Sequence, residues 1–288
     1  MYKSLVIKGG GILITAEIGA LTAVYEAGLL NGIKRVAGTS AGSIIATLFA
    51  LGYNPIDLSS MVMAIDFRKF EDSANIFELL TGKHGLYRGR YFQDWIEGYI
   101  SVKAGKSFAT FKDLFDKGFM DLNVVTTYLN QGEVMICSHA NTPNVIVSES
   151  VRASMSIPIL FDRFRFTQGI DSKKDFQDGG VLLNYPIELY DGEPPEEVLG
   201  IYPHDITGYK PPLFVDGEGL YKYARATFEA SMNAQDAAIF QNAKWMKQTI
   251  LVDNLGISST NFKVTPEDKQ RLYNSGLRCA NEFIHGKS

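Results

Sequence analysis

The sequence predicts an α/β fold, a three-layer sandwich in which helices cover both faces of a mostly parallel central sheet. Short β-rich runs alternate with helical ones, and two strand–loop–helix units follow each other at the N-terminus. The first unit has a strand over 4–8, three glycines and a helix over 12–27. The second has a strand over 35–37, a sharp turn and a helix over 42–51. Such alternation is typical of parallel sheets, because the crossover helices lie on the faces of the sheet.

The rest of the chain continues this pattern. Residues 55–107 are expected to be mainly helical, interrupted by a glycine-bearing loop over 82–89, and to form a lid or an insertion. Asn130-Gln131-Gly132 is typical of a hairpin turn between two β-rich runs. The later elements are expected as strands over 123–129, 134–138, 161–167, 198–202 and 249–252, and as helices over 148–155, from Gly219 to about 247, and after Pro266.

Length and composition favour one globular domain over residues 1–288, with the motifs in 4–190 and residues 190–288 completing the sandwich. Apolar residues make up 45% of the chain and charged residues 21%. The net charge of -4 lacks the basic excess of a nucleic-acid binder, so we expect no nucleic-acid partner. The sequence carries no signal for an oligomeric state.

The compartment is predicted from cysteines and apolar runs. Cys137 and Cys279 form neither a CxxC pair nor a disulfide framework, which favours a reducing compartment and gives no zinc site. The N-terminus has no secretory signal, and no run of 18 apolar residues occurs. We therefore expect a cytoplasmic protein without a transmembrane segment; secretion as an effector would leave no such mark.

The strongest chemical signal is Gly38-Thr39-Ser40-Ala41-Gly42, a G-x-S-x-G motif between a predicted strand and a predicted helix. A serine hydroxyl is a poor nucleophile at neutral pH, so it needs a sharp turn, a base and nearby backbone amides. Gly38 and Gly42 permit such a turn, because they remove side chains where the strand reverses into the helix. The pentapeptide alone fits equally well an ordinary turn in which Ser40 caps the helix.

Gly9, Gly10 and Gly11 follow the first predicted strand and precede a helix, which predicts an oxyanion hole built from backbone amides. A dinucleotide site is the competing interpretation. It lacks the third glycine of its fingerprint, because position 14 is Ile, and the second strand does not end in an acidic residue. Gly105-Lys106-Ser107 resembles the end of a phosphate loop, but the earlier glycine that such a loop requires is replaced by Ile100.

Asp178 is followed by Gly179 and Gly180, so it lies on a turn that can present a carboxylate without crowding. Asp-Gly is a common turn signal and is weak evidence alone. Asp178 becomes informative only together with the other motifs of the chain.

Four blocks in order over residues 4–189 resemble the patatin-like phospholipase family. They are Gly9-Gly10-Gly11 with Ile18-Gly19-Ala20-Leu21, Gly38-Thr39-Ser40-Ala41-Gly42, Ser154-Met155-Ser156-Ile157-Pro158-Ile159-Leu160-Phe161, and Asp178-Gly179-Gly180-Val181 with Asn184 and Pro186. The resemblance implies an α/β sandwich related to cytosolic phospholipase A2 catalytic domains. It also implies a Ser/Asp dyad without a catalytic histidine: Ser40 as nucleophile, Asp178 as its base, and the amides of residues 9–11 as the oxyanion hole.

The implied reaction is acyl transfer from a lipid or ester substrate through an acyl-enzyme on Ser40, of the phospholipase A or lysophospholipase type, with no metal or cofactor. One departure from the family pattern bears on the head group of the substrate. The family usually has Arg or Lys two residues after the third glycine, and this chain has Leu13 there. Acyl hydrolysis is therefore a firmer prediction than preference for phospholipids.

Two other functions remain open at this level. An α/β-hydrolase esterase would need a Ser/His/Asp triad with one of the four histidines, His84, His139, His204 or His285, as base. A catalytically silent lipid-binding protein could keep the same fold. Apolar side chains in the expected insertion are core residues or an acyl-chain entrance with transient membrane contact; they are Phe67, Phe70, Phe77, Leu79, Leu80, Leu86, Tyr87, Tyr91 and Trp95.

Overall fold

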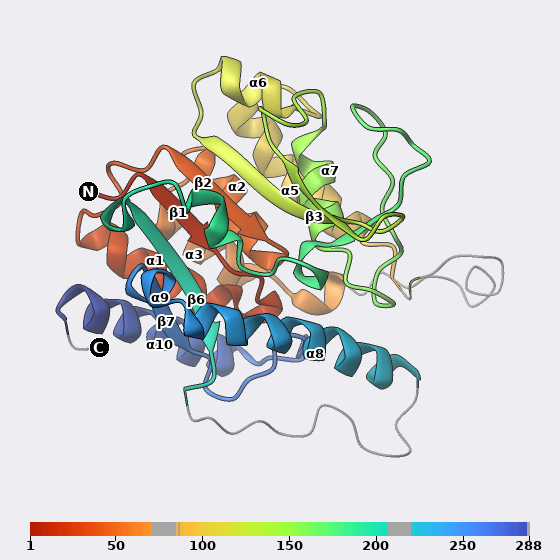
Figure 1. Ribbon diagram of the computed structural model, residues 1–288. Coiled ribbons are helices and arrows are strands. Elements are labelled where there is room, and N and C mark those ends of the chain that lie inside the picture. The colour runs from red at the N-terminus through yellow and green to blue at the C-terminus, as the bar shows by residue number, and fades with distance from the viewer. Residues whose placement is uncertain (71–84, 86, 207–219, 287–288) are drawn as a thin grey trace.

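The computed structural model describes residues 1–70, 85, 87–206 and 220–286 (Figure 1). Within these residues one sheet contains seven strands in the order β4-β3-β2-β1-β6-β7, with β5 paired to β3. The β1/β2, β1/β6, β2/β3 and β6/β7 pairs are parallel, and β4 and β5 are antiparallel to β3. The mostly parallel sheet is thus confirmed. The strands are β1 Ser4–Ile7, β2 Arg35–Thr39, β3 Asp121–Tyr128, β4 Glu133–Cys137, β5 Phe176–Asp178, β6 Val198–His204 and β7 Thr249–Asp253.

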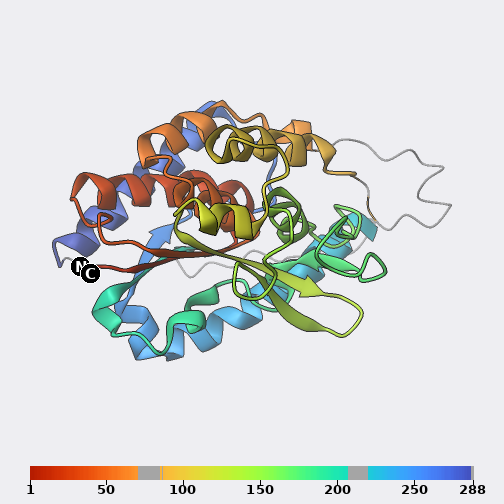
Figure 2. The same cartoon turned by 90° about the horizontal axis from the view of Figure 1, so that it is seen from above.

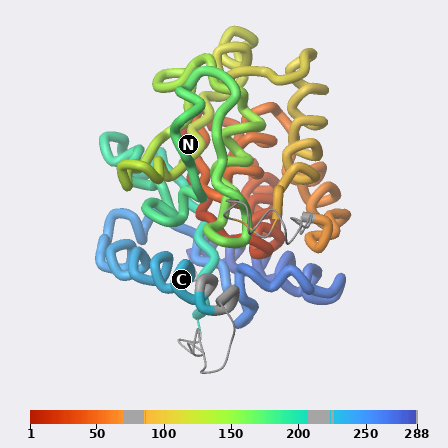
Figure 3. Tube along the Cα trace, turned by 90° about the vertical axis from the view of Figure 1, so that its right-hand side faces the viewer, coloured from red at the N-terminus to blue at the C-terminus, as the bar shows by residue number. Residues whose placement is uncertain are grey.

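Helices cover both faces of this sheet. Figures 2 and 3 show α8 on one face and α10 on the other, with α1 and α3 on the side of α10. The α-helices are α1 Ile14–Glu26, α2 Ala41–Ala50, α3 Pro55–Ala64, α5 Arg90–Ala104, α6 Phe111–Asp116, α7 Val147–Ser154, α8 Leu220–Gln241, α9 Ala243–Lys247 and α10 Pro266–Ile284. Short 3-10 turns are η1 Gly11–Leu13, η2 Phe67–Phe70, η3 Gly179–Val181, η4 Pro186–Tyr190 and η5 Pro195–Glu197.

The sheet separates the apolar interior into two cores. The central strand β1 contributes to both, because successive side chains of a strand point to opposite faces. Leu5 and Ile7 belong to the large core together with the helices on the α10 side. Val6 belongs to a smaller core that contains Tyr202 of β6 and Ile239 of α8. All three β1 side chains are fully buried, as the continuous apolar run predicts for a strand with both faces covered.

Helix α1 packs closely against α10 through two glycines. A Cβ on Gly19 would lie 2.1 Å from the carbonyl oxygen of Tyr273, and one on Gly276 would lie 2.0 Å from that of Ala16. Only glycine lets the two backbones approach this far. The glycine in the Ile18-Gly19-Ala20-Leu21 block therefore serves helix packing, which holds α10 against the sheet.

The predicted strand over 161–167 is wrong. This segment makes only isolated bridges, from Phe161 to Tyr87 and from Phe164 to Phe176. The structure also adds the short elements α6 and β5, and it ends the predicted long helix at Gln241. The side chain of Asn242 accepts from the backbone amides of Lys244 and Trp245 and so caps α9 as a separate helix. Of the predicted loop over 82–89, residues 82–84 and 86 lie outside the described residues.

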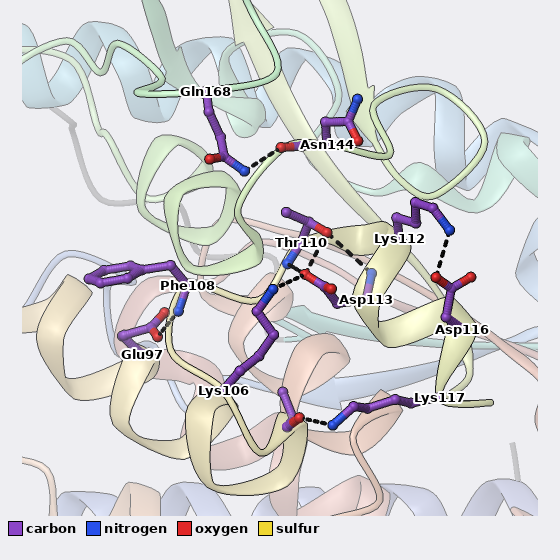
Figure 4. A network of polar contacts seen from close by, with 11 residues as sticks. Glu97, Lys106, Phe108, Thr110, Lys112, Asp113, Asp116, Lys117, Asn144 and Gln168 are labelled. Atoms are coloured by element: carbon purple, nitrogen blue, oxygen red, sulfur yellow. Dashed lines mark hydrogen bonds and ion pairs between the residues drawn. The ribbon is translucent and has the colours of Figure 1, made fainter.

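The connection between α5 and α6 contains Gly105-Lys106-Ser107, and Figure 4 shows how its polar side chains are engaged. Lys106 Nζ lies 3.0 Å from Asp113 Oδ2, and Thr110 and Asp113 form a capping box at the start of α6. The segment follows a helix and not a strand, so it lacks the strand–loop–helix context of a phosphate loop. Lys106 therefore pairs with a residue that caps α6.

Candidate active site

Ser40 lies on the turn between β2 and α2, with φ 50° and ψ -128°. These are unfavourable angles for a residue with a side chain, and such strain is typical of a nucleophile elbow. The turn is held by its surroundings. The Ser40 amide donates to Ser154 Oγ at 2.8 Å, and a Cβ on Gly42 would lie 2.4 Å from the carbonyl oxygen of Lys8. A Cβ on Gly38 would lie 2.4 Å from the carbonyl oxygen of Gly42, so both predicted glycines are needed for close approach.

Strand β3 brings Asp178 next to Ser40 across 138 positions of sequence. Strand β2 ends at Thr39, which is paired with Val125 of β3. Strand β5 ends at Asp178, which is paired with Thr126, the next residue of β3. The two strands therefore end at neighbouring register positions of one shared strand.

Ser40 and Asp178 form a buried hydrogen-bonded pair. Ser40 Oγ donates to Asp178 Oδ2 at 2.7 Å, and the other carboxylate oxygen accepts from the amide of Gly180 at 2.7 Å. Ser40 is 5% exposed and Asp178 is fully buried. Burial raises the pKa of Asp178 to about 7, and the hydrogen bonds from Ser40 and Gly180 oppose this rise. The carboxylate is thus tuned to exchange a proton near neutral pH.

Backbone contacts fix the orientation of Asp178. Its amide donates to the carbonyl oxygen of Ser156 at 2.9 Å, and Thr127 Oγ1 donates to its carbonyl oxygen at 2.9 Å. A Cβ on Gly179 would lie 2.4 Å from the carbonyl oxygen of Val125, so a side chain there would push the turn away from β3. Ser154 and Ser156, which the sequence motif contains without indicating a role, thus support Ser40 and Asp178 respectively.

The three N-terminal glycines differ in what their amides do. The Gly9 amide donates to the carbonyl oxygen of Asn184 at 2.9 Å, and Asn184 Nδ2 donates back to the Gly9 carbonyl at 3.1 Å. Among the described residues, no group accepts from the amides of Gly10 and Gly11. Gly11 has φ +54°, and a Cβ there would lie 2.1 Å from the carbonyl oxygen of Ser259. Gly10 and Gly11 are therefore the two available backbone donors of this loop.

Two cavities lie on either side of the glycine loop. A narrow one of about 10 Å³ is apolar, and its lining includes Gly11, Ile14, Ala41, Met155, Phe161 and Phe262. Phe67, one of the residues predicted to lie in the core or at an acyl-chain entrance, also lines it and belongs to the large core. Of the other residues in that prediction, Tyr87 and Trp95 pack against the core and Tyr91 is exposed. The remaining ones lie outside the described residues; they are the Phe70 side chain, Phe77, Leu79, Leu80 and Leu86. The second cavity measures about 180 Å³, and charged, polar and apolar side chains line it together.

Sequence reasoning missed Glu17, which lies in the middle of the apolar helix α1. It is fully buried, and neither carboxylate oxygen has a hydrogen-bond partner in the described structure. Burial raises its pKa well above the usual range, and Lys8 opposes the rise. A Cβ on Gly10 would lie 3.3 Å from Glu17 Oε1, so this carboxyl group lies directly beside the glycine loop. The sequence offered one signal for it, a single acidic residue within an otherwise apolar helix.

The histidines are placed elsewhere. His139 stacks on Phe115, with ring centroids 3.8 Å apart, and His204 packs beside Phe240. His285 is the residue after α10, and His84 lies outside the described residues. In the described part of the chain, no histidine is hydrogen-bonded to the Ser40 or Asp178 side chain.

The residues that the structure describes offer neither a metal-binding cluster nor a helix that could span a membrane. These residues contain no group of three His, Cys, Asp or Glu side chains that could hold a metal ion. None of their helices is both long enough and apolar enough to cross a membrane.

The chain and its fold have relatives among known proteins. The chain belongs to the patatin-like phospholipase family, whose model matches residues 5–191. It is 30% identical to the uncharacterized protein R571 of Acanthamoeba polyphaga mimivirus, over 98% of this chain and 93% of the relative. It is 28% identical to the probable lipid hydrolase 463L of Invertebrate iridescent virus 6, over 65% of this chain and 63% of the relative.

A solved structure shares the fold. The crystal structure of VipD from Legionella pneumophila superposes with a TM-score of 0.73 at 18% identity, covering 99% of this chain and 67% of that one. At this level of identity the likeness concerns the fold alone.

Proposed function

We propose that this chain is a serine lipid acyl hydrolase in which Ser40 is the nucleophile and Asp178 is the general base. The observation that carries the proposal is the 2.7 Å hydrogen bond from Ser40 Oγ to a buried carboxylate, made on a strained turn. Membership of the patatin-like phospholipase family supports it, as does the name of the relative 463L, a probable lipid hydrolase.

The reaction proceeds in two halves. Ser40 Oγ attacks the ester carbonyl carbon while its proton passes to Asp178, and the carbonyl oxygen becomes an oxyanion. The ester C–O bond then breaks, and the leaving alcohol takes the proton from Asp178. In the second half Asp178 accepts a proton from water, whose oxygen attacks the acyl-enzyme, and the fatty acid leaves as Ser40 regains its proton. The net change is hydrolysis of one ester bond.

The amides of Gly10 and Gly11 stabilise the oxyanion in this proposal. They stand at the start of η1, beside the nucleophile, and have no acceptor among the described residues. The structural contact between the loop and Ser40 runs through Gly9, where a Cβ would lie 3.1 Å from Ser40 Cβ. Removing one such donor typically costs about 10²–10³ in kcat, so these amides carry a large share of the rate.

The apolar cavity beside Gly11 and Ala41 suits the acyl chain. Its wall is made of aliphatic, aromatic and methionine side chains. At about 10 Å³ it holds only a small part of a chain, so Phe67 or Phe161 must move for a long acyl group to enter. Ile159, which is 37% exposed two residues before Phe161, offers a point of transient contact with a lipid surface.

The Ser/His/Asp esterase and the silent lipid-binding protein remain the alternatives to this proposal. The direct bond between Ser40 and Asp178 supports a dyad over a triad, because a triad places a histidine between the nucleophile and the acid. A silent protein has no need to hold a serine in a strained conformation, which costs about 1–3 kcal/mol.

We also propose that the chain forms one domain and acts in the cytoplasm. Pairing of β1 with β6 and packing of α1 on α10 support a shared interior for residues before and after 190. Cys137 and Cys279 are buried free thiols, which supports a reducing compartment.

The test combines covalent labelling with product analysis. A fluorophosphonate probe should label the wild type and not Ser40→Ala, while Ser60→Ala, which removes an exposed hydroxyl from α3, should label normally. Fatty-acid release from phospholipids, galactolipids, monoacylglycerols and short esters then identifies the substrate class. Labelling of Ser40→Ala at the wild-type rate, or no release from any ester by folded wild type, would refute the proposal.

A further inference from the structure

Asn184 carries a buried hydrogen-bond acceptor beside the proposed catalytic pair. The residue is 2% exposed, and its Oδ1 accepts no hydrogen bond from any residue that the structure describes. The Nδ2 of the same side chain donates to the Gly9 carbonyl at 3.1 Å, which fixes how the amide group is turned. A buried carbonyl oxygen without a donor costs free energy, so it favours a bound molecule that brings an O–H group.

Two glycines bring this oxygen close to both members of the pair. A Cβ on Gly9 would lie 2.1 Å from Asn184 Oδ1 and 3.1 Å from Ser40 Cβ. A Cβ on Gly180 would lie 2.8 Å from Asn184 Oδ1 and 3.0 Å from Asp178 Oδ1. Asn184 Oδ1 therefore has the serine on one side and the carboxylate on the other.

The backbone holds Asn184 in this place. Its amide donates to Gln235 Oε1 at 2.8 Å, and its carbonyl oxygen accepts from the Gly9 amide at 2.9 Å. Gln235 Nε2 also donates to the Gly180 carbonyl at 2.9 Å. One side chain of α8 thus ties Asn184 to the turn that follows Asp178.

Formation of the acyl-enzyme leaves the carboxylate in need of another donor. In the free enzyme Ser40 Oγ donates to Asp178 Oδ2 at 2.7 Å. Once Oγ is bonded to the acyl carbon it has no hydrogen to donate, and a carboxylate only accepts. Asn184 also lines the cavity of about 180 Å³ beside the glycine loop, and a cavity needs only about 10–15 Å³ to hold one water. Water can thus approach Asn184 from this cavity.

We propose that Asn184 Oδ1 and Asp178 together hold the water that hydrolyses the acyl-enzyme; this rests on the proposed hydrolase function. The water donates one hydrogen to Asp178 and the other to Asn184 Oδ1, which turns its oxygen toward the acyl carbon. That oxygen bonds to the carbon, and the first proton passes to Asp178. The bond from Ser40 Oγ to the carbon then breaks as Oγ takes this proton. The second hydrogen stays on the fatty acid, so Asn184 orients the water and accepts no proton.

The experiment measures how the acyl-enzyme divides between water and methanol. Methanol has a single O–H hydrogen, which must go to Asp178, so it gains nothing from Asn184. Attack by methanol gives a methyl ester, and attack by water gives a fatty acid. Both products are measured by gas chromatography after turnover of a 4-nitrophenyl ester at pH 8 and a fixed methanol concentration. Since both arise from the same acyl-enzyme, their ratio depends neither on the rate of acylation nor on the amount of folded enzyme.

Three variants test the role of the acceptor, with Ser40→Ala as the blank. Asn184→Leu removes the acceptor with a side chain of similar size, so the ratio of methyl ester to fatty acid should rise about threefold to tenfold, the effect of one lost hydrogen bond. Asn184→Asp keeps an oxygen acceptor and should keep the wild-type ratio. Asn123→Leu is the matched control, because it removes an amide whose Nδ2 donates to Tyr190 Oη at 3.4 Å, and it should keep the ratio too.

The outcomes separate the two proposals. A wild-type ratio in Asn184→Leu would overturn the role of Asn184 and leave the hydrolase intact. If Asn184→Leu does not fold, Asn184→Asp decides, because it changes the group that faces Gly9 and keeps the acceptor: the wild-type ratio supports the inference, and a raised ratio overturns it. Absence of any product that depends on Ser40 would refute the hydrolase function itself.

Discussion

The dependence of the reaction on pH follows directly from the environment of Asp178. Only the charged carboxylate can accept the proton of Ser40, so kcat/KM must follow the fraction of Asp178 that is deprotonated in the free enzyme. Burial raises its pKa to about 7, whereas an exposed aspartate titrates near 3.9. The rate should therefore rise with pH through about 7 and level off above it.

The magnitude follows from that value. With a pKa of about 7, roughly 1% of Asp178 is charged at pH 5 and about 90% at pH 8, so kcat/KM should be about 100-fold lower at pH 5. An aspartate with an ordinary pKa would already be mostly charged at pH 5, and the profile between these two pH values would be nearly flat.

The assay is hydrolysis of a short 4-nitrophenyl ester, read at a wavelength where nitrophenol and nitrophenolate absorb equally. The rate of fluorophosphonate labelling should follow the same curve, because it requires the same proton transfer. Samples returned from pH 5 to pH 8 must regain full activity, which excludes acid unfolding. His204→Gln should leave the midpoint near 7, since histidine also titrates in this range. A flat profile in folded protein, or a midpoint that disappears with His204, would contradict the role of Asp178.

Three further substitutions probe the same site. Asp178→Asn should lower kcat/KM by about 10²–10⁴. The raised pKa means that ionising the buried Asp178 destabilises the wild type as pH rises from about 4 to 7. The Tm of the variant should therefore exceed that of the wild type by more at pH 8 than at pH 5. Gly9→Ala would place a Cβ 2.1 Å from Asn184 Oδ1 and should abolish activity and lower Tm, whereas Gly98→Ala, with open space around it in α5, should raise Tm slightly. Glu17→Gln removes an unpartnered buried carboxyl and should raise Tm more at high pH than at low pH, as calorimetry can show.

Local sequence patterns predicted the first half of the sheet well, because each signal there is short-ranged. The run from Ser4 into Gly9 and the run from Arg35 into Gly42 each combine an apolar strand, glycines at a close approach and an apolar helix. Their parallel pairing then follows from the crossover helix between them. No distant residue is needed to recognise either unit.

The predicted strand over 161–167 shows where such patterns fail. Its alternation is real: the Phe166 ring packs against the rings of Phe164 and Phe176, while Arg163 and Arg165 both pair with Asp175. The side chains alternate as in a strand, yet the backbone makes only one bridge to Phe176. Period-two patterning reports which side chains share a face, and it does not show whether a neighbouring strand has free groups to pair with.

For a related reason, the sequence could not show which of the glycine amides is already hydrogen-bonded. Three adjacent glycines look equivalent in the sequence, but Gly9 is bonded to Asn184, which lies 175 positions away. The turn after Asp178 places Asn184 there, and Gln235 of α8 holds the Asn184 amide at 2.8 Å. A helix in the last third of the chain thus decides which glycine remains a donor.

The same dependence on distant parts bears on the role as a base that we propose for Asp178. The motif supplies the carboxylate, but its pKa of about 7 comes from complete burial, which outweighs the opposing hydrogen bonds from Ser40 and Gly180. An exposed Asp-Gly turn with the same letters would hold a carboxylate that is charged at neutral pH yet too weakly basic to take a serine proton. In the proposed mechanism, catalysis therefore depends on the packing of the sheet around Asp178, and substitutions that let water reach Asp178 should lower the rate even when Ser40 and Asp178 are unchanged.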